Sequence, residues 1–400
     1  MPSIIGVEVA KTSVLCCNLD DGLPVPSDPA QFAHSYEPIP ILANSDGVKR
    51  LLELGDHYVI EPTGDYSRVW INTLRANGKT VLRVNPKRVS ALKQYHGVAS
   101  KTDRYDAAFL AIYGAMNHGK PSAFLSDYAE ELREATAQHQ FLSRQTGNLQ
   151  RRLWQLLSHE WPEACRVASG KKPQQRRLWL SPHPPALWRF VAGESVRNQK
   201  SREASLDETI GSGLSVMSKT LAAQVCEMER QQFLIEEHIA AILEVSEFKP
   251  YHTVFDRFGF GEMTRAVLLS RIYPFDRFLG PDGKPRREKR PSSKTEGRFH
   301  RRDRSLGAFR MALGNGTRVY QSGQDMKRRA AGSQLTRTAL YLHVGTKICM
   351  ASARNLAMPP KLRAHADYHQ SLAGVPHKQA VSKTMSRIVK DLYRELLATL

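Results

Sequence analysis

The stretch SKTDRYDAAFLA, residues 100–111, places two aspartates three residues apart at the entrance to an apolar run. The apolar run predicts a helix that enters the protein core. Residues three apart share one face of a helix, so the like charges of Asp103 and Asp106 repel each other there. We therefore expect something positive to offset them. The candidates are the neighbouring Lys101 and Arg104, solvent, or a metal ion.

The overall charge points to an anionic partner. The chain has 400 residues, enough for two or three domains, and it carries 58 Lys and Arg against 39 Asp and Glu, a net charge of +19. Such a balance favours nucleic acid as the partner, with an anionic membrane surface second. The sequence has no run of eighteen apolar residues, no signal-peptide pattern and five scattered cysteines. These features predict a reduced, cytoplasmic protein that does not span a membrane.

The first region, residues 1–120, alternates strand and helix signals, which predicts an α/β sheet. Two short β-branched runs predict a hairpin whose turn lies near residues 10–12. The other strands are expected over 57–60 and 80–84, and the helices over 44–55, 66–76 and 103–117.

The second region, residues 121–250, is helical. Two long amphipathic segments, 125–157 and 219–245, are expected to pack as an antiparallel coiled coil around an intervening segment, 166–218. The apolar stripe expected on the first helix consists of Leu132, Phe141, Leu142, Leu149, Leu153 and Leu156.

The third region, residues 251–400, is expected to be mostly helical. It contains a basic block, 281–304, with ten Lys and Arg against four acidic residues. Such a block is usually a solvated loop or a nucleic-acid-binding arm. The chain closes with an amphipathic helix expected over 376–399.

Four carboxylates of the first region fall at the ends of predicted elements. Glu8 lies inside the first strand, Glu61 follows a strand directly before a Pro-Thr-Gly turn, and Asp103 and Asp106 begin a helix. A few carboxylates at neighbouring ends suit Mg²⁺, which neutralises charge in phosphodiester chemistry. Each residue also has a simpler interpretation: an edge-strand charge, a turn cap or a helix N-cap.

Several motifs resemble the IS110/IS1111 family of transposases. The segments that resemble its N-terminal half are GVEVAK (6–11), VIEPTGDYSR (59–68), LRVNPKRVSALK (82–93) and SKTDRYDAAFLA (100–111). The segments that resemble its C-terminal domain are FGFGEMTRAVLLSRI (258–272), FRMALGNGTRVYQSGQ (309–324), KRRAAGSQLTRTALYL (327–342) and AGVPHKQAVSKTMSRIVKDLY (373–393). The resemblance covers most of the chain. It implies a RuvC-like, RNase H-fold catalytic domain, a long-helix coiled-coil middle and a C-terminal, mostly helical transposase domain.

The resemblance also implies residue roles. Glu8, Glu61, Asp103 and Asp106 take the places of an acidic tetrad that holds Mg²⁺, and Ser322 takes the place of a nucleophilic serine. The family's first acid is usually Asp, in a pattern like GIDVSK, whereas this chain has Glu8. The implied chemistry is strand exchange through a phosphoserine link. The implied partners are donor DNA, target DNA and a non-coding bridge RNA.

Basic side chains near these motifs are candidates for nucleic-acid contact. Aromatic side chains among basic ones can stack on bases, although core packing is their commoner fate; these are Trp179, Trp188, Phe190 and Phe299. The basic candidates are Lys11, Lys87, Arg88, Lys101, Arg286, Arg287, Arg290, Lys327, Arg328 and Arg329.

Three functions stay open from the sequence. The first is an RNA-guided DNA transposase, the second a site-specific DNA invertase or RuvC-like nuclease, and the third a nucleic-acid-binding protein whose catalysis is impaired at Glu8. Two DNA sites must be cut together, so we expect a homodimer or homotetramer with an apolar seam along the long helices. The expected location is the nucleoid of a bacterial or archaeal cell.

Overall fold

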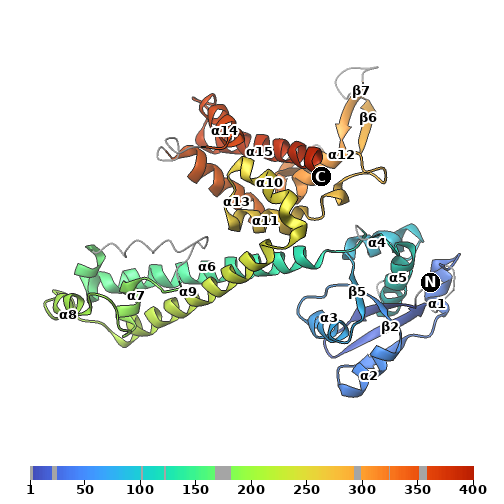
Figure 1. Cartoon of the computed structure of the whole chain (residues 1–400), viewed down its shortest axis with the longest axis horizontal. Coiled ribbons are helices and arrows are strands. Elements are labelled where there is room, and N and C mark those ends of the chain that lie inside the picture. Colours follow the sequence, from blue (N-terminus) through green and yellow to red (C-terminus); the bar gives the residue numbers. More distant parts are fainter. Residues whose placement is uncertain are drawn as a thin grey trace. The chain divides into compact units, whose positions relative to one another are not determined.

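The computed structural model describes residues 3–19, 25–100, 102–120, 123–166, 182–291, 299–323, 325–350 and 358–400, with only the backbone of His300, Ser322 and Arg328. The chain divides into two compact units, Met1–Asp127 and Tyr128–Leu400 (Figure 1). Among the described residues, no helix has the length and apolar character needed to cross a membrane.

A five-stranded mixed sheet organises the first unit, with the strand order β3-β2-β1-β4-β5. The predicted hairpin is confirmed: β1 and β2 are antiparallel, and Val9 lies opposite Val14 across the turn. β1 and β4 are parallel, as are β4 and β5. β1 is therefore a central strand, and the α/β character expected of this region is confirmed. The strands are β1 (Ile4–Val9), β2 (Ser13–Leu19), β3 (Ile39–Leu42), β4 (His57–Ile60) and β5 (Thr80–Arg83).

Helices cover both faces of this sheet (Figure 1), and the alternation of side chains along β1 sorts them. Ile5 and Val7 face α2 and α3, and their buried side chains pack with those of these helices. Gly6 and Glu8, on the other face of β1, point to the side of α1, α4 and α5. The helices are α1 (Pro29–Ser35), α2 (Ser45–Glu53), α3 (Tyr66–Ala76), α4 (Pro86–Tyr95) and α5 (Asp103–Met116).

Helix α5 lies against β1 with almost no side-chain bulk between the two backbones. A Cβ atom added to Gly6 would meet the carbonyl oxygen of Ala107 and would lie 2.5 Å from the backbone nitrogen of Ala111. Further along the same face of α5, a Cβ atom on Gly114 would collide with the side chain of Val59. Residues 107, 111 and 114 repeat at helical spacing, so a stripe of small residues lets α5 approach the sheet.

We predict that Gly6→Ala destabilises the first unit. Overpacking a close-packed interior costs about 1–3 kcal/mol, and the contact here is with backbone, which has little room to move. Urea unfolding at 25 °C measures the effect. The matched control is Gly147→Ala in the second unit, where nothing lies within 4 Å. There the change should be neutral or stabilising by up to about 1 kcal/mol, because Ala favours helix over Gly. Equal stability of Gly6→Ala and wild type would contradict the packing argument.

Two long antiparallel helices, α6 (Asp127–Glu160) and α9 (Val216–Leu243), form an arm of the second unit (Figure 1). The side chains of α6 that face α9 recur at alternating spacings of four and three, the repeat of a coiled coil. The expected coiled-coil pairing is thus present. The seam positions on α6 are Leu132, Thr136, His139, Ser143, Thr146, Gln150, Leu153 and Leu157.

The middle of this seam is polar. His139 Nε2 lies 2.9 Å from Glu236 Oε1, and the Ser143 hydroxyl donates a hydrogen bond to Gln232 Oε1 at 2.9 Å. These pairs satisfy buried polar groups that would otherwise be costly. Polar pairs at seam positions fix the register of a coiled coil. The other pairs are Gln232 to Thr146 (2.8 Å) and Gln150 to Glu229 (2.9 Å).

The predicted apolar stripe is therefore partly wrong. Phe141 is 61% exposed, and Leu157 rather than Leu156 is buried in the arm. Polar residues in a sequence usually indicate a solvent-exposed helix face, but here they are buried in the seam. The apolar pattern therefore predicted a neighbouring face of α6 as the contact with α9.

The far end of the arm has its own small core. Trp188 is 2% exposed and packs with Trp161, while Phe190 is partly buried against the same cluster. Base stacking by Trp188 is therefore excluded by its burial, and Trp179 lies outside the described residues. The helices here are α7 (Ala186–Val191) and α8 (Gln199–Asp207).

The C-terminal body is helical with two antiparallel ribbons, β6–β7 and β8–β9. The basic block 281–304 contains β6 and β7, so the expectation of a loop is wrong, whereas a nucleic-acid-binding arm stays a prediction. Opposite charges face each other across this ribbon, as at Arg287 with Asp303 and Glu288 with Arg302, and such pairs stabilise strands. The strands are β6 (Arg287–Pro291), β7 (Phe299–Asp303), β8 (Gly316–Ser322) and β9 (Asp325–Ala331), and the helices are α10 (Lys249–Phe258), α11 (Glu262–Ile272), α12 (Arg304–Ala312), α13 (Gln334–Val344), α14 (Pro360–Gln370) and α15 (His377–Thr399).

Candidate active site

Two of the predicted acids lie at one edge of the sheet. Glu8 is the penultimate residue of β1, and Glu61 directly follows β4. Because β1 and β4 are parallel, their carboxyl ends lie at the same edge. Glu8 is half-buried on a central strand, so it is not the solvent-facing edge charge of the simpler interpretation. Its Oε2 atom is buried and has no hydrogen-bond partner among the described residues.

The other two acids come from the first turn of α5. The N-cap is Thr102, whose hydroxyl accepts a hydrogen bond from the Tyr105 N–H at 3.4 Å. Asp103 is therefore not needed as the cap. The close packing of α5 on Gly6 brings the start of this helix to the sheet face that carries Glu8.

The positive charge beside the aspartates is Lys93, which the sequence analysis missed. Lys93 Nζ lies 2.5 Å from Asp106 Oδ1, and the residue is only 7% exposed. Arg104 instead donates to the carbonyl oxygens of His34 and Tyr36, and Lys101 lies outside the described residues. The available signal was the spacing of Lys93 from Val89, one helical turn earlier on the buried face of α4.

The four carboxylates interact electrostatically. The pKa of Glu8 rises from 4.5 to about 8, chiefly because burial penalises the charged form and further because of the charges of Glu61, Asp106 and Asp103; Lys93 lowers it. As placed, no three His, Cys, Asp or Glu side chains in the described ranges meet at metal-binding distance. The four acids thus lie close enough to influence one another's charge, but their side chains do not yet form a set of metal ligands. A buried, unpartnered carboxylate oxygen among other carboxylates fits a hard divalent cation in donor chemistry.

We predict that Glu8→Gln stabilises the first unit at high pH in metal-free buffer. Wild-type Glu8 holds its proton in the folded state above pH 4.5, whereas the unfolded chain releases it. The free energy of unfolding of the wild type therefore falls as pH rises from 4.5 to about 8. The amide introduced by Glu8→Gln does not titrate, so the variant does not lose this stability. With about 1.4 kcal/mol per pKa unit, and some solvent screening, the gain at pH 8.5 should be on the order of 2 kcal/mol.

Urea unfolding in EDTA at pH 5 and pH 8.5 measures this difference. The control is Glu53→Gln, at an exposed position that ends α2. A gain from Glu8→Gln that is equal at both pH values would contradict the assignment of the raised pKa to Glu8.

The remaining predicted residues lie elsewhere. Ser322 is the last residue of β8, and its backbone lies opposite that of Asp325 on β9. The structure describes only the backbone of Ser322. Lys327 and Arg329 are exposed on β9, while the Arg328 side chain is not described. Because Ser322 belongs to the second unit, its role stays a prediction.

The basic candidates of the first unit differ in their surroundings. Lys11 is exposed at the β1–β2 turn, and Lys87 is exposed at the start of α4. Arg88 is engaged within the fold: its Nη1 donates to the hydroxyl of Tyr113 at 3.1 Å and to the carbonyl of Ala123 at 2.7 Å. Nucleic-acid contact by these residues stays a prediction.

Comparison with known proteins finds a family match for the N-terminal part of the chain. Residues 5–162 match the model of the DEDD domain of IS110 elements, which is described as a transposase. The fold and the match define a DNA transposase or recombinase. Residues 5–162 therefore carry the transposase domain of the IS110 family. No curated protein matches it. The matched segment includes all four acids and ends within the arm, well before Ser322.

Proposed function

We propose that this transposase cuts and rejoins DNA with an acidic tetrad of Glu8, Glu61, Asp103 and Asp106 and with Ser322 as the nucleophile. The observation that carries the proposal is the raised pKa of Glu8, because the four effects that raise it are burial and, after it, the charges of the other three tetrad carboxylates. Perturbed carboxyl groups gathered at one sheet edge are typical of catalytic sites. The mixed sheet with β1 at its centre supports a RuvC-like, RNase H type of fold for the first unit.

The tetrad residues would hold Mg²⁺. A bound divalent cation supplies charge stabilisation at a phosphate and lowers the pKa of the attacking hydroxyl. Lys93, paired with Asp106, would hold that carboxylate in place. Since Glu replaces the usual Asp at position 8, its longer side chain carries the carboxylate farther from β1.

Two transfers at phosphorus would account for cutting and joining. In the first, the Ser322 oxygen bonds to a DNA phosphate, its proton leaves, and the bond from phosphorus to one DNA oxygen breaks, so that oxygen becomes a hydroxyl. In the second, a hydroxyl of the partner strand attacks the phosphoserine and restores Ser322. The phosphoserine link conserves the bond energy for rejoining, whereas a nuclease that uses water needs no such link.

Ser322→Ala and Glu8→Ala should each abolish a protein–DNA adduct that protease digestion removes on a denaturing gel. The assay contains the full chain, Mg²⁺, RNA transcribed from the flanks of the gene, and donor and target DNA. The control is Ser371→Ala, at an exposed position after α14, which should retain the adduct within about twofold. Ser322→Ala removes the oxygen that would bond to phosphorus, so its adduct should fall below detection.

The outcomes separate the three functions. An adduct lost in both variants supports the recombinase, including an invertase, and its dependence on RNA separates the guided enzyme from the invertase. Cleavage without an adduct identifies a nuclease that uses water. Tight nucleic-acid binding without cleavage identifies a binding protein impaired at Glu8.

The partners proposed are DNA and a bridge RNA in the cytoplasm. The β8–β9 ribbon supports a polyanion contact, because Arg318 lies directly opposite Arg329. Like charges at such positions destabilise a strand pair unless an anion lies between them. Phe299, 66% exposed on β7, is the aromatic candidate that stays accessible for stacking.

The outer face of the arm supports the proposed homodimer or homotetramer. Phe141 and Leu234 are 61% and 63% exposed, and with Leu142 and Ile235 they line a hollow of about 590 Å³. Exposed apolar patches of this kind mark association sites.

We predict that Phe141→Ser with Leu234→Ser lowers the oligomeric state measured by light scattering. The control pair is Leu42→Ser with Tyr95→Ser, which are also exposed apolar positions but belong to the first unit. An unchanged mass for the arm variant would place the subunit interface elsewhere.

A further inference from the structure

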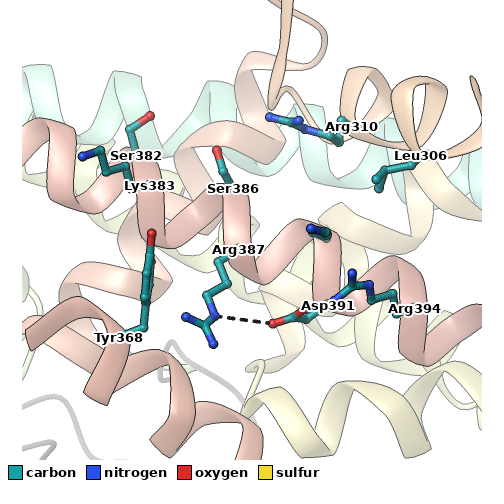
Figure 2. A pocket seen from close by; sticks show the side chains of 10 residues that line it. Leu306, Arg310, Tyr368, Ser382, Lys383, Ser386, Arg387, Asp391 and Arg394 are labelled. Atoms are coloured by element: carbon teal, nitrogen blue, oxygen red, sulfur yellow. Dashed lines mark hydrogen bonds and ion pairs between the residues drawn. The ribbon is translucent and has the colours of Figure 1, made fainter. Parts of the chain in front are cut away.

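Helix α15 carries a stripe of positive charge along a groove. Lys383, Arg387, Lys390 and Arg394 follow one another at spacings of four, three and four, so they share one face of the helix. Figure 2 shows Lys383, Arg387 and Arg394 along the groove with Arg310, which comes from α12. Lys390 lines the same groove. The groove has a volume of about 580 Å³.

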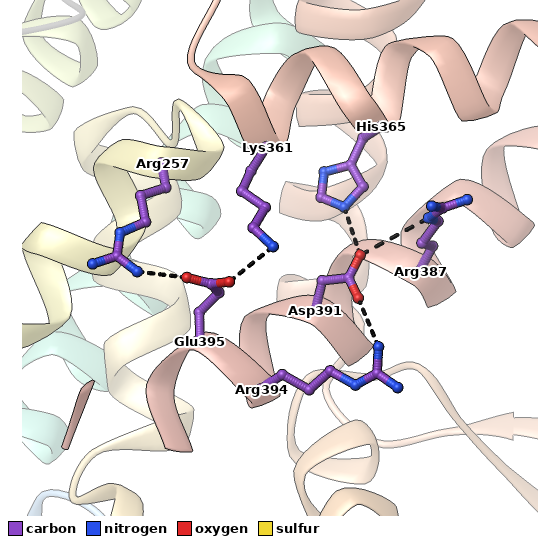
Figure 3. A network of polar contacts seen from close by, with 7 residues as sticks. All are labelled: Arg257, Lys361, His365, Arg387, Asp391, Arg394 and Glu395. Carbon is purple, nitrogen blue, oxygen red and sulfur yellow. Dashed lines mark hydrogen bonds and ion pairs between the residues drawn. The ribbon is translucent and has the colours of Figure 1, made fainter. Parts of the chain in front are cut away.

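A single carboxylate, Asp391, holds the arginines of this stripe in place (Figure 3). Its Oδ2 lies 3.2 Å from Nε2 of His365, which is 1% exposed, and 3.9 Å from Nε of Arg387; its Oδ1 lies 3.5 Å from Nη1 of Arg394. The Arg387 guanidinium also lies 4.4 Å from the ring centre of Tyr368. Five cations thus line a groove that contains one acid, and two of the five are preorganised.

The nearby acid on α15 does not cancel this charge. Glu395 lies beside the network but contacts Arg257 at 2.5 Å and Lys361 at 2.8 Å (Figure 3). These two cations come from α10 and α14 and do not line the groove. The excess positive charge of the stripe therefore stays directed into the groove.

The groove continues under the β6–β7 ribbon. A second hollow, of about 1000 Å³, shares Leu306 and Arg310 with the first. Four more arginines line it: Arg286, Arg301, Arg302 and Arg304.

The acids that line this second hollow already have hydrogen-bond partners within the protein. Glu288 Oε1 accepts a hydrogen bond from Arg304 Nε at 2.6 Å, and Asp303 caps α12 by accepting the Leu306 N–H at 2.8 Å. The two hollows therefore form one basic track that crosses α12.

We propose that this track binds the phosphate backbone of duplex DNA. The stripe from Lys383 to Arg394 spans about 16 Å at 1.5 Å per residue, which corresponds to about five phosphates of one strand at 3.4 Å of axial rise each. One face of Tyr368 is covered by Arg387, so the groove offers no open ring there for unpaired bases. DNA, rather than RNA, follows from the transposase class. The inference rests on the proposed function only for this choice of polyanion.

The test is DNA binding by Lys383→Gln with Lys390→Gln in the full chain. Both lysines are exposed in the groove. The probe is a fluorescent 25-base-pair duplex of mixed sequence, measured by anisotropy in EDTA over a range of salt concentrations. The variant should bind roughly tenfold more weakly, and the slope of log affinity against log salt should fall by about 1.8, or about 0.9 for each lost phosphate contact. The matched control is Lys249→Gln with Lys378→Gln, exposed lysines that do not line the groove, which should stay within about twofold of wild type.

A duplex RNA of the same sequence distinguishes the polyanions. A loss of DNA affinity at least fivefold greater than the loss of RNA affinity supports the proposal. Unchanged DNA affinity and slope, or a loss that is equal for both or confined to RNA, would overturn it. Because EDTA prevents cutting, the result is independent of the adduct formed by Ser322, and either proposal can fail while the other stands.

Discussion

The contact between Gly6 of β1 and Ala107 of α5 is the constraint on which the first unit depends. It leaves no space for a Cβ atom, so the depth and angle of α5 on the sheet are fixed by backbone against backbone. Asp103 lies one turn before Ala107 and Asp106 directly before it, while Glu8 lies two residues after Gly6 on the same face of β1. A single close approach therefore determines how far the helix carboxylates are from the strand carboxylate. A larger residue at position 6 would move the acids as well as the core.

This arrangement works against the stability of the isolated fold. Burial and, after it, neighbouring like charges raise the pKa of Glu8 to about 8, and Lys93 only partly offsets them. An uncharged core residue of the same size would carry no free-energy cost from a buried charge or from repulsion by other carboxylates. Local rules are usually broken at functional sites, where something else repays the conflict. The combination of a well-packed helix and a poorly satisfied carboxylate is what we expect of the proposed tetrad, which would bind a cation rather than serve stability alone.

The sequence predicted the parts of the fold that depend on local periodicity. The hairpin at residues 10–12, the helix over 66–76 and the start of α5 at Asp103 all follow from strand alternation, turn residues and capping. It did not predict the polar seam of the arm, because the burial of His139 and Glu236 depends on the contact between them, and the two are far apart in the sequence. Lys93 was missed for the same reason: a charged residue on a core face is explained by its partner, and the partner is distant in sequence. The four acids were singled out in the sequence because a motif, rather than a period, marks them, and their role stays a prediction.

The distribution of charge in the second unit separates structural acids from functional cations. Glu288, Asp391 and Glu395 each contact at least two basic groups, so these acids are used inside networks. Other cations of this unit gather along α15, under β6–β7 and on β8–β9. Like charges gathered on one surface raise its free energy until an anion approaches. A surface selected only for solubility would mix positive and negative side chains, so solubility alone does not explain this clustering of cations. The repeated negative charge of a nucleic-acid backbone does explain it.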